Sequence, residues 1–190
     1  MPEVSTQITG GKVKGHKIRA GHGSGLRPTT QKVRASIYSI LGKDSVEGLR
    51  VLDLYAGTGV LGIEALSRGA LYADFVESHY GRCRNLRETL KMLNLTSISQ
   101  VHNSKVEKVL NNLSGNYGLV LIDPPYEKDQ WSVVMNMLNE HGLVNQSGNV
   151  VTEHHYTQQM AVRYGKFVLT KTKRYGDTSI SVYNVENANG

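Results

Sequence analysis

From Leu49 onward, short apolar runs alternate with segments of helical spacing, and this alternation constrains the fold more than any other feature. Runs such as RVLDLY and YGLVLID are expected to be buried strands, and segments such as RCRNLRETLKMLN are expected to be helices. This alternation predicts an α/β fold with a parallel, doubly wound sheet covered by helices on both faces. The last two runs, GKFVLTKTKR and TSISVYNV, are joined only by YGD, which is too short for a crossover helix. The mostly parallel sheet is therefore expected to end in an antiparallel hairpin.

The beginning of the chain differs in composition and is expected to form an appendage. Residues 4–25 are rich in Gly, Lys, Arg and His and contain short alternating stretches typical of a small hairpin or ribbon. Apolar residues then recur at helical spacing until Gly42, which predicts a helix. We therefore divide the chain into an N-terminal basic ribbon plus helix, residues 1–45, expected to bind RNA, and a larger domain, residues 46–190.

Composition narrows the choice of partners and compartment. The chain has 22 Lys and Arg against 16 Asp and Glu, a formal net charge of +6, which favours an anionic partner, nucleic acid first. A single cysteine, Cys83, allows no internal disulfide and fits a reducing compartment. No apolar run approaches the length of about 18 residues that a membrane span needs. His154 and His155 lack further ligands at a usable spacing, so we expect no metal and a cytoplasmic protein.

A glycine-rich turn follows the first strand of the larger domain. Gly57, Gly59 and Gly62 match the G-x-G-x-x-G pattern, which suits a nicotinamide dinucleotide or S-adenosylmethionine, and Glu77 is spaced to bind ribose hydroxyls in either case. Asp53 precedes the turn by four residues, where it could serve a cationic aminoacyl or sulfonium group but would repel a pyrophosphate. Asp53 therefore favours S-adenosylmethionine, and Gly62 is then expected to be a helix-packing position.

The stretch YGLVLIDPPYE contains the most specific motif. Asp123, Pro124, Pro125 and Tyr126 follow an apolar strand, at the sheet edge where ligands of open α/β sheets bind. The prolines lack N–H groups, so the cleft would present hydrogen-bond acceptors only. Such a cleft suits the exocyclic amine of a nucleobase, whose two hydrogens Asp123 and a backbone carbonyl near Pro124 could accept, with an extruded base stacked on Tyr126. These residues are the candidate catalytic group for methyl transfer to that nitrogen.

Taken together, these motifs resemble the bacterial RsmD family, methyltransferases that modify the exocyclic N2 of one guanine in small-subunit (16S) ribosomal RNA. The resemblance extends from about Ile8 to Tyr183 and rests on the stretches LRPTTQKVRASIYSIL, VLDLYAGTGVLGIEALSRGA, FVES, LVLIDPPYE and KRYGDTSISVY. It implies a Rossmann-like class I methyltransferase fold, S-adenosylmethionine as cofactor, and 16S ribosomal RNA as substrate within a partly assembled small subunit.

The resemblance also implies roles for individual residues. The catalytic pocket would be formed by Asp123, Pro124, Pro125 and Tyr126. The cofactor would be bound by Asp53, Tyr55, Gly57 and Gly59 around its methionine part, by Glu77 at its ribose, and by Asn103 or Ser104 at its adenine. RNA would be bound by Arg27, Thr29, Lys32 and Arg34. The chain departs from the family at Gln31, where an acidic residue is usual, and at HNSKV, where an Asp is common.

Three other functions agree with parts of this pattern. Adenine N6 methylation of DNA or RNA would use the same DPPY motif, but it predicts an added target-recognition domain. A dinucleotide-dependent oxidoreductase would use the same glycines. A non-catalytic RNA-binding assembly factor could retain the fold without the chemistry. S-adenosylmethionine and NAD binding, and the effect of replacing Asp123, distinguish these alternatives.

Overall fold

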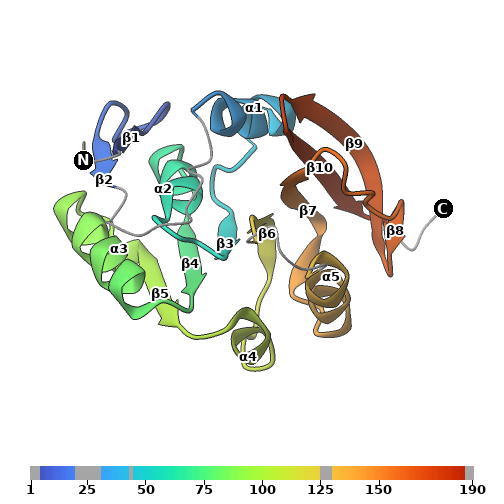
Figure 1. Cartoon of the computed structure of the whole chain (residues 1–190). Helices are drawn as coiled ribbons and strands as arrows, with labels where there is room; N and C mark the ends of the chain where they lie inside the picture. The colour runs from blue at the N-terminus through green and yellow to red at the C-terminus, as the bar shows by residue number, and fades with distance from the viewer. Residues whose placement is uncertain (1–4, 20–30, 43–44, 125–129, 187–190) are drawn as a thin grey trace.

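The computed structural model describes residues 5–19, 31–42, 45–124 and 130–186. Its centre is an eight-stranded sheet in the order β5-β4-β3-β6-β7-β10-β9-β8 (Figure 1). The strands are β3 (Arg50–Leu54), β4 (Tyr72–Glu77), β5 (Ser99–Asn103), β6 (Tyr117–Ile122), β7 (Val144–His155), β8 (Arg163–Tyr164), β9 (Phe167–Tyr175) and β10 (Thr178–Val185). Strands β3 to β7 pair in parallel, and β10 pairs antiparallel with both β7 and β9. The predicted α/β sheet with an antiparallel ending is confirmed.

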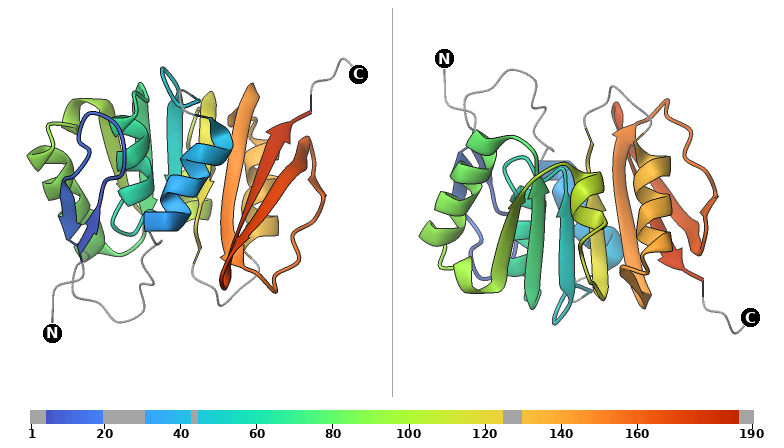
Figure 2. Two further views of the ribbon diagram at one scale, coloured as in Figure 1. Left: turned by 90° about the horizontal axis from the view of Figure 1, so that it is seen from above. Right: turned by 90° about the horizontal axis from the view of Figure 1, so that it is seen from below.

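Helices cover both faces of the sheet (Figure 2). One face carries α1 (Gln31–Leu41), α2 (Val60–Ser67) and α3 (Tyr80–Met92), and the other carries α4 (Val106–Leu110) and α5 (Trp131–Glu140). A short 3-10 turn, η1 (Thr96–Ile98), precedes β5. Each face has its own cluster of buried apolar side chains, because residues along a strand point alternately to the two sides. The sheet is therefore buried on both faces, as its apolar strands require.

The N-terminal ribbon consists of β1 (Ser5–Gln7) and β2 (Lys17–Arg19), which pair antiparallel as predicted. It lies over α2, where the Lys12 amide donates to the Ser67 carbonyl at 2.7 Å. Ile8 of the ribbon and Ile37 of α1 belong to the same apolar cluster as the strands of the larger domain. The division at residue 45 is therefore a proposal about function, since the two parts share one core.

The fifth core strand differs in length from the sequence prediction. The run GNVVTEHH predicts a strand from residue 148, whereas β7 begins at Val144. The pairing of β6 with β7 shifts register between Tyr117 and Leu119, which accommodates the extra residues. Local sequence does not reveal such an extension, because VNQSG lacks the apolar alternation of a strand.

No helix among the described ranges combines the length and the apolar character needed to cross a membrane.

Candidate functional site

The strand register brings three predicted site elements to one edge of the sheet. Leu54 at the end of β3 lies opposite Val76 in β4 and Ile122 in β6. The turn after Leu54, the Glu77 carboxylate and Asp123 therefore follow neighbouring parallel strands at the same carboxyl edge. This edge, on either side of β3, is where open α/β sheets bind ligands.

The glycine turn has the backbone conformation that its sequence suggests. Gly57 and Gly59 have φ of +55° and +74°, in the left-handed region that favours glycine. A Cβ on Gly59 would overlap the side chain of Leu86 in α3. Gly62, one turn into α2, has no room for a Cβ because the Phe75 ring lies against it. The prediction of Gly62 as a helix-packing position is confirmed.

Glu77 is buried and holds the glycine turn to the end of β4. Its Oε2 accepts a hydrogen bond from the Gly57 amide at 3.0 Å, and its Oε1 accepts from the His79 amide at 2.7 Å. The Arg82 guanidinium lies 3.8 Å from Oε2. A carboxylate has about four lone-pair positions, so Glu77 can also accept from a ligand hydroxyl. The arrangement agrees with the predicted ribose contact.

Asp53 is buried at the N-terminus of α2. Its Oδ2 accepts from the Gly62 amide at 2.9 Å. Burial raises the pKa of the Asp53 carboxyl to about 7, although the Gly62 hydrogen bond opposes this rise, and the charges of Asp123 and Glu77 increase it further. A carboxylate therefore already takes part of the anion-binding end of α2, where a dinucleotide pyrophosphate would bind. The three acidic groups favour a cationic ligand instead.

The raised pKa of Asp53 predicts pH-dependent cofactor binding. S-adenosylmethionine carries a sulfonium, which binds better to the ionised carboxylate, so affinity is expected to rise between pH 6 and pH 8 as Asp53 loses its proton. The Asp53→Asn variant should bind more weakly at pH 8 and lose that part of the pH dependence. Calorimetric titration of both proteins at several pH values measures this effect. Parallel pH profiles for the two proteins would contradict it.

Asp123 follows β6 directly, and its side chain is half-buried. Its charge contributes to the raised pKa of Asp53, which places the two carboxyl groups within electrostatic range of each other. Pro124 is buried behind it. Pro125 and Tyr126, the other members of the predicted catalytic group, lie outside the described residues.

Asn103 and Ser104 lie beside Glu77 at the end of β5. The Asn103 amide donates to the carbonyl of Ser78 at 2.9 Å, and the Ser104 backbone amide donates to the carbonyl of Glu77 at 3.1 Å. A cavity of about 290 Å³ adjoins both residues. Its lining consists of His102, Asn103, Ser104, Lys108, Val109, Asn112 and Leu113. The cavity gives the predicted adenine contacts a possible space for a ring.

Tyr55 opens the glycine turn in an unusual conformation. Its φ is +59°, which is uncommon for a residue with a side chain and marks local backbone strain. Its ring packs against the cluster of apolar residues beneath α4 and α5, and burial raises the pKa of its hydroxyl. Strain of this kind gathers at functional sites, so Tyr55 remains a predicted cofactor contact.

The predicted RNA contacts divide into three groups. Lys32 is exposed on the first turn of α1, while Arg27 and Thr29 lie outside the described residues. The prediction for Arg34 is wrong, because its side chain is fully buried. Its guanidinium donates to the Gln7 carbonyl at 2.7 Å and lies 3.7 Å from the Glu64 carboxylate. Basic residues of one short segment look alike in sequence, but the helix turns Arg34 inward and Lys32 outward.

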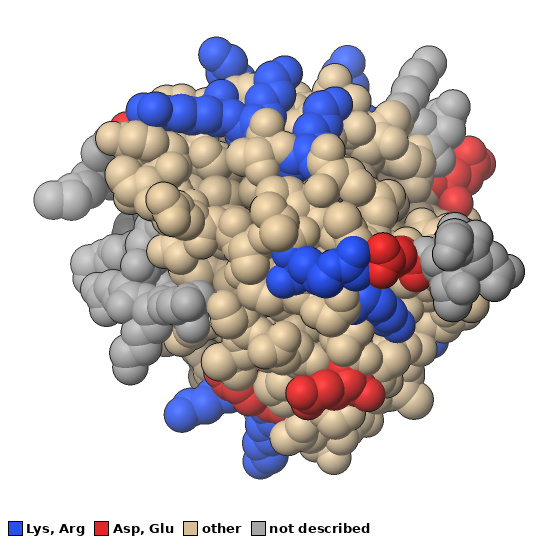
Figure 3. All heavy atoms as spheres, turned by 90° about the vertical axis from the view of Figure 1, so that its right-hand side faces the viewer, with Lys and Arg blue, Asp and Glu red and all other residues tan. Residues whose placement is uncertain are grey.

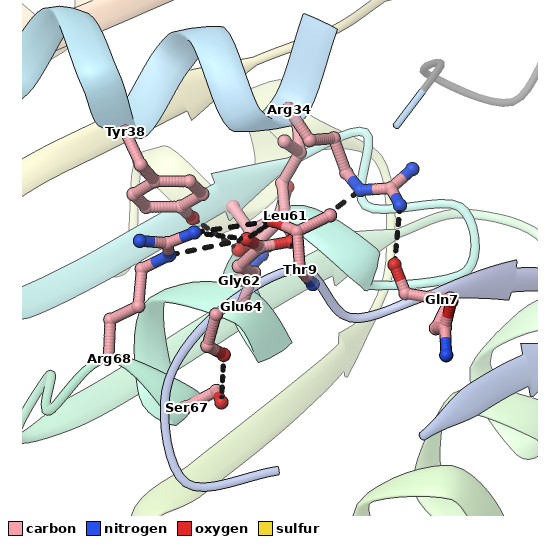
Figure 4. A network of polar contacts seen from close by, with 11 residues as sticks. Gln7, Thr9, Arg34, Tyr38, Leu61, Gly62, Glu64, Ser67 and Arg68 are labelled. Atoms are coloured by element: carbon pink, nitrogen blue, oxygen red, sulfur yellow. Dashed lines mark hydrogen bonds and ion pairs between the residues drawn. The ribbon is translucent and has the colours of Figure 1, made fainter. Parts of the chain in front are cut away.

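The burial of Arg34 reveals a polar network that sequence reasoning did not identify (Figure 4). Glu64 of α2 lies at its centre and is fully buried. Its carboxylate accepts hydrogen bonds from Arg68 at 2.7 Å and from the Thr9 hydroxyl of the ribbon. Arg68 in turn lies over the Tyr38 ring, with its guanidinium carbon 4.6 Å from the ring centroid. The one sequence signal is an acidic residue inside the otherwise apolar helix VLGIEALS.

His154 has a structural role. Its Nε2 lies 2.9 Å from the Ser181 hydroxyl and its Nδ1 lies 3.0 Å from the His155 carbonyl, and burial lowers the pKa of its ring. Across the described part of the chain, no three His, Cys, Asp or Glu side chains are arranged to hold a metal ion.

The sheet order and the glycine turn between β3 and α2 define a Rossmann-like class I methyltransferase fold. A solved structure from Escherichia coli described as "Putative methyltransferase yhhF" has the same fold. It superposes with a TM-score of 0.88 at 24% sequence identity, covering 96% of this chain and 99% of that chain. S-adenosylmethionine is the cofactor that this fold indicates, in agreement with the sequence prediction.

Sequence comparison identifies the family. The family model described as "Conserved hypothetical protein 95" matches residues 6–184. The "Putative rRNA methyltransferase YlbH" of Bacillus subtilis is 32% identical over 180 residues, which cover 93% of this chain and 97% of that protein. The "Ribosomal RNA small subunit methyltransferase D" of Escherichia coli is 28% identical over 180 residues, which cover 95% of this chain and 90% of that protein. The chain belongs to the Conserved hypothetical protein 95 family, and the resemblance to the RsmD family is confirmed.

Proposed function

We propose that the protein transfers a methyl group from S-adenosylmethionine to the exocyclic N2 of a guanine in 16S ribosomal RNA. The observation that carries this proposal is the position of Asp123 and Pro124, at the end of β6 and beside the glycine turn after β3. This position sets a hydrogen-bond acceptor for the target amine next to the proposed cofactor site. The names of the rRNA methyltransferases that share this family support RNA as the substrate.

The acidic groups of the edge account for cofactor binding. S-adenosylmethionine carries a positively charged sulfonium, and its α-amino group is a second cation when protonated. Asp53, Glu77 and Asp123 repel one another electrostatically, as the raised pKa of Asp53 shows, and a bound cation relieves that repulsion. Glu77 also fixes the Gly57 amide, so the turn is held in place before the cofactor binds.

Asp123 would act on the nucleophile. Its carboxylate would accept a hydrogen bond from the guanine N2 amine and align the nitrogen lone pair with the methyl group. As the methyl group moves, positive charge develops on nitrogen, and the carboxylate stabilises that charge and can accept the released proton. The sulfonium is already a good leaving group, so the protein contributes mainly alignment and charge.

The basic appendage would hold the RNA. Lys32 is exposed on α1, and Arg27 and Thr29 stay predicted contacts. A guanine inside a helix cannot present N2 in line with a sulfonium, so the base must leave the stack to react. We propose a partly assembled small subunit as the substrate, because a packed ribosomal surface would hinder this extrusion.

The decisive experiment compares RNA from a gene-deletion strain with RNA from its parent. The purified protein and methyl-labelled S-adenosylmethionine are mixed with small subunits from the deletion strain, and the RNA is digested to nucleosides. We expect label in N2-methylguanosine, on RNA from the deletion strain and not from the parent. Label in N6-methyladenosine would instead support the adenine alternative.

Two controls separate the remaining alternatives. Protection from thermal unfolding by NAD, with none by S-adenosylmethionine, would support an oxidoreductase. Deletion that changes no base methylation, while subunit assembly fails and Asp123→Ala restores it, would support a non-catalytic assembly factor.

A further inference from the structure

The tip of the β9–β10 hairpin lies at the same edge of the sheet as Asp123. Ile122 of β6 pairs with Thr152 of β7, and β7 continues to His155, which pairs with Thr178 at the start of β10. Thr178 in turn pairs with Tyr175 at the end of β9. Neighbouring strands are about 4.8 Å apart, so three spacings put β9 about 14 Å from β6 across the sheet.

The end of β9 is strongly basic. Lys171, Lys173 and Arg174 are all exposed, and we call these three residues the β9 rim. Figure 3, which faces the right-hand side of the molecule in Figure 1, shows Lys and Arg side chains gathered along the upper border of this face. Lys171 and Lys173 pair with Val182 and Ile180, whose side chains belong to the core cluster on the α1 side. The two lysines therefore project on the side of the sheet that carries α1, the helix of Lys32.

Charges in the β9 rim lack the neutralising partners found elsewhere on this face. Arg163 of β8, at the far end of the hairpin, forms a paired salt bridge with Glu186 at 2.6 and 2.9 Å. Within the described ranges, no ion pair includes a member of the β9 rim. Both rim lysines act on Tyr175: burial raises the pKa of its hydroxyl, but Ser36 of α1 and the two lysines outweigh burial and lower it. Like charges held this closely favour an anionic partner.

Arg174 is fixed in a flat orientation on the opposite side of the hairpin tip. Its guanidinium carbon lies 3.5 Å from the centroid of the Tyr156 ring, and its Nε donates to the Gly176 carbonyl at 2.7 Å. The His155 ring packs against Tyr156, with centroids 4.7 Å apart. A guanidinium stacked in this way keeps the N–H groups of its two terminal amino groups for a ligand, and its planar fork matches a phosphate.

We infer that the β9 rim binds the phosphates of RNA next to the target guanine, forming a second RNA contact on the far side of Asp123 from the N-terminal ribbon. This inference rests on the proposed function for the identity of the RNA. Phosphates supply the negative charge that the rim lacks, and RNA held at both sides of the edge would stay in place while the base is extruded. Ribosomal proteins that accompany this RNA are commonly basic and would be repelled by the rim.

The test compares the Lys171→Gln/Lys173→Gln variant with a matched control, Arg84→Gln/Lys91→Gln. The control removes two exposed positive charges from α3 and leaves the rim intact. Small-subunit RNA from the deletion strain is titrated at 50 to 200 mM salt. Each lost phosphate contact lowers the salt slope by roughly 0.7 to 0.9, so wild type should lose about eight-fold more affinity over this range than the rim variant. The control should follow wild type.

Methylation kinetics provide the second measurement. The rim variant is expected to raise KM for RNA while kcat at saturating RNA stays near wild type, and Arg174→Lys should raise KM as well, because an ammonium cannot replace the planar fork. Unchanged melting temperatures with the demethylated cofactor would show that the variants are folded. Salt slopes and KM equal to wild type in the rim variant would overturn the inference, even if ribosomal proteins lost affinity. Failure of wild type to methylate any RNA would instead refute the proposed function.

Discussion

Asp123→Asn is expected to lower kcat for methyl transfer by about 10²- to 10⁴-fold, the range for loss of a positioned acid or base. The amide keeps the size of the side chain but cannot carry the negative charge that stabilises the methylated nitrogen. Its NH₂ group would also face the amine hydrogens of guanine. Single-turnover transfer of labelled methyl to RNA measures the effect directly.

The matched control is Glu140→Gln, which removes an exposed carboxylate at the end of α5. Its rate should equal that of wild type. Cofactor affinity is compared at pH 8.5, because Asp123 raises the pKa of Asp53 and its loss would otherwise alter the protonation of Asp53. An Asp123→Asn protein that retains more than a tenth of wild-type kcat would exclude the proposed role of this carboxylate.

Glu64→Ala is expected to reduce the free energy of unfolding by about 3–5 kcal/mol, the usual cost of removing one member of a buried ion pair. The Arg34 guanidinium would remain fully buried without its carboxylate neighbour, and Arg68 and Thr9 would lose their shared acceptor. Urea denaturation measures the effect as a lower midpoint at an unchanged slope.

Two further variants separate this cost from a general effect of losing charge. Glu88→Ala removes an exposed carboxylate that lies 3.9 Å from Arg84 on α3, and it should cost less than about 1 kcal/mol. The pair Glu64→Leu/Arg34→Met replaces buried charges by apolar groups of similar size and should recover most of the loss. Equal destabilisation by Glu64→Ala and Glu88→Ala would show that the network contributes little.

Most of the fold could be predicted because it follows from local patterns. Apolar runs separated by helical segments specify a parallel sheet, and the short YGD link forces the antiparallel hairpin. The early start of β7 could not be predicted, because it depends on pairing with Tyr117 of β6 across a register shift. Pairing between distant segments leaves no periodic signal in either of them.

The candidate site could be predicted where a residue type has a narrow use. Gly57, Gly59 and Gly62 lie where a side chain is strained or sterically excluded, and Asp53 and Glu77 converge on them through the sheet register. Lys and Arg have broader uses, so local sequence did not distinguish an exposed Lys32 from a buried Arg34. The distinction depends on which face of α1 meets Glu64, a residue 30 positions further along the chain.

Helix α2 connects two events that the sequence presents as separate. Its first turn holds Asp53 through Gly62, and its middle holds the ribbon through Glu64, only two residues later. Eight residues of helix span about 12 Å, too short and too well packed to bend between these contacts. If RNA binding shifts the ribbon, the same displacement reaches the cofactor end of the helix. Affinities for RNA and cofactor are then thermodynamically linked, and each ligand must change the affinity for the other by the same factor.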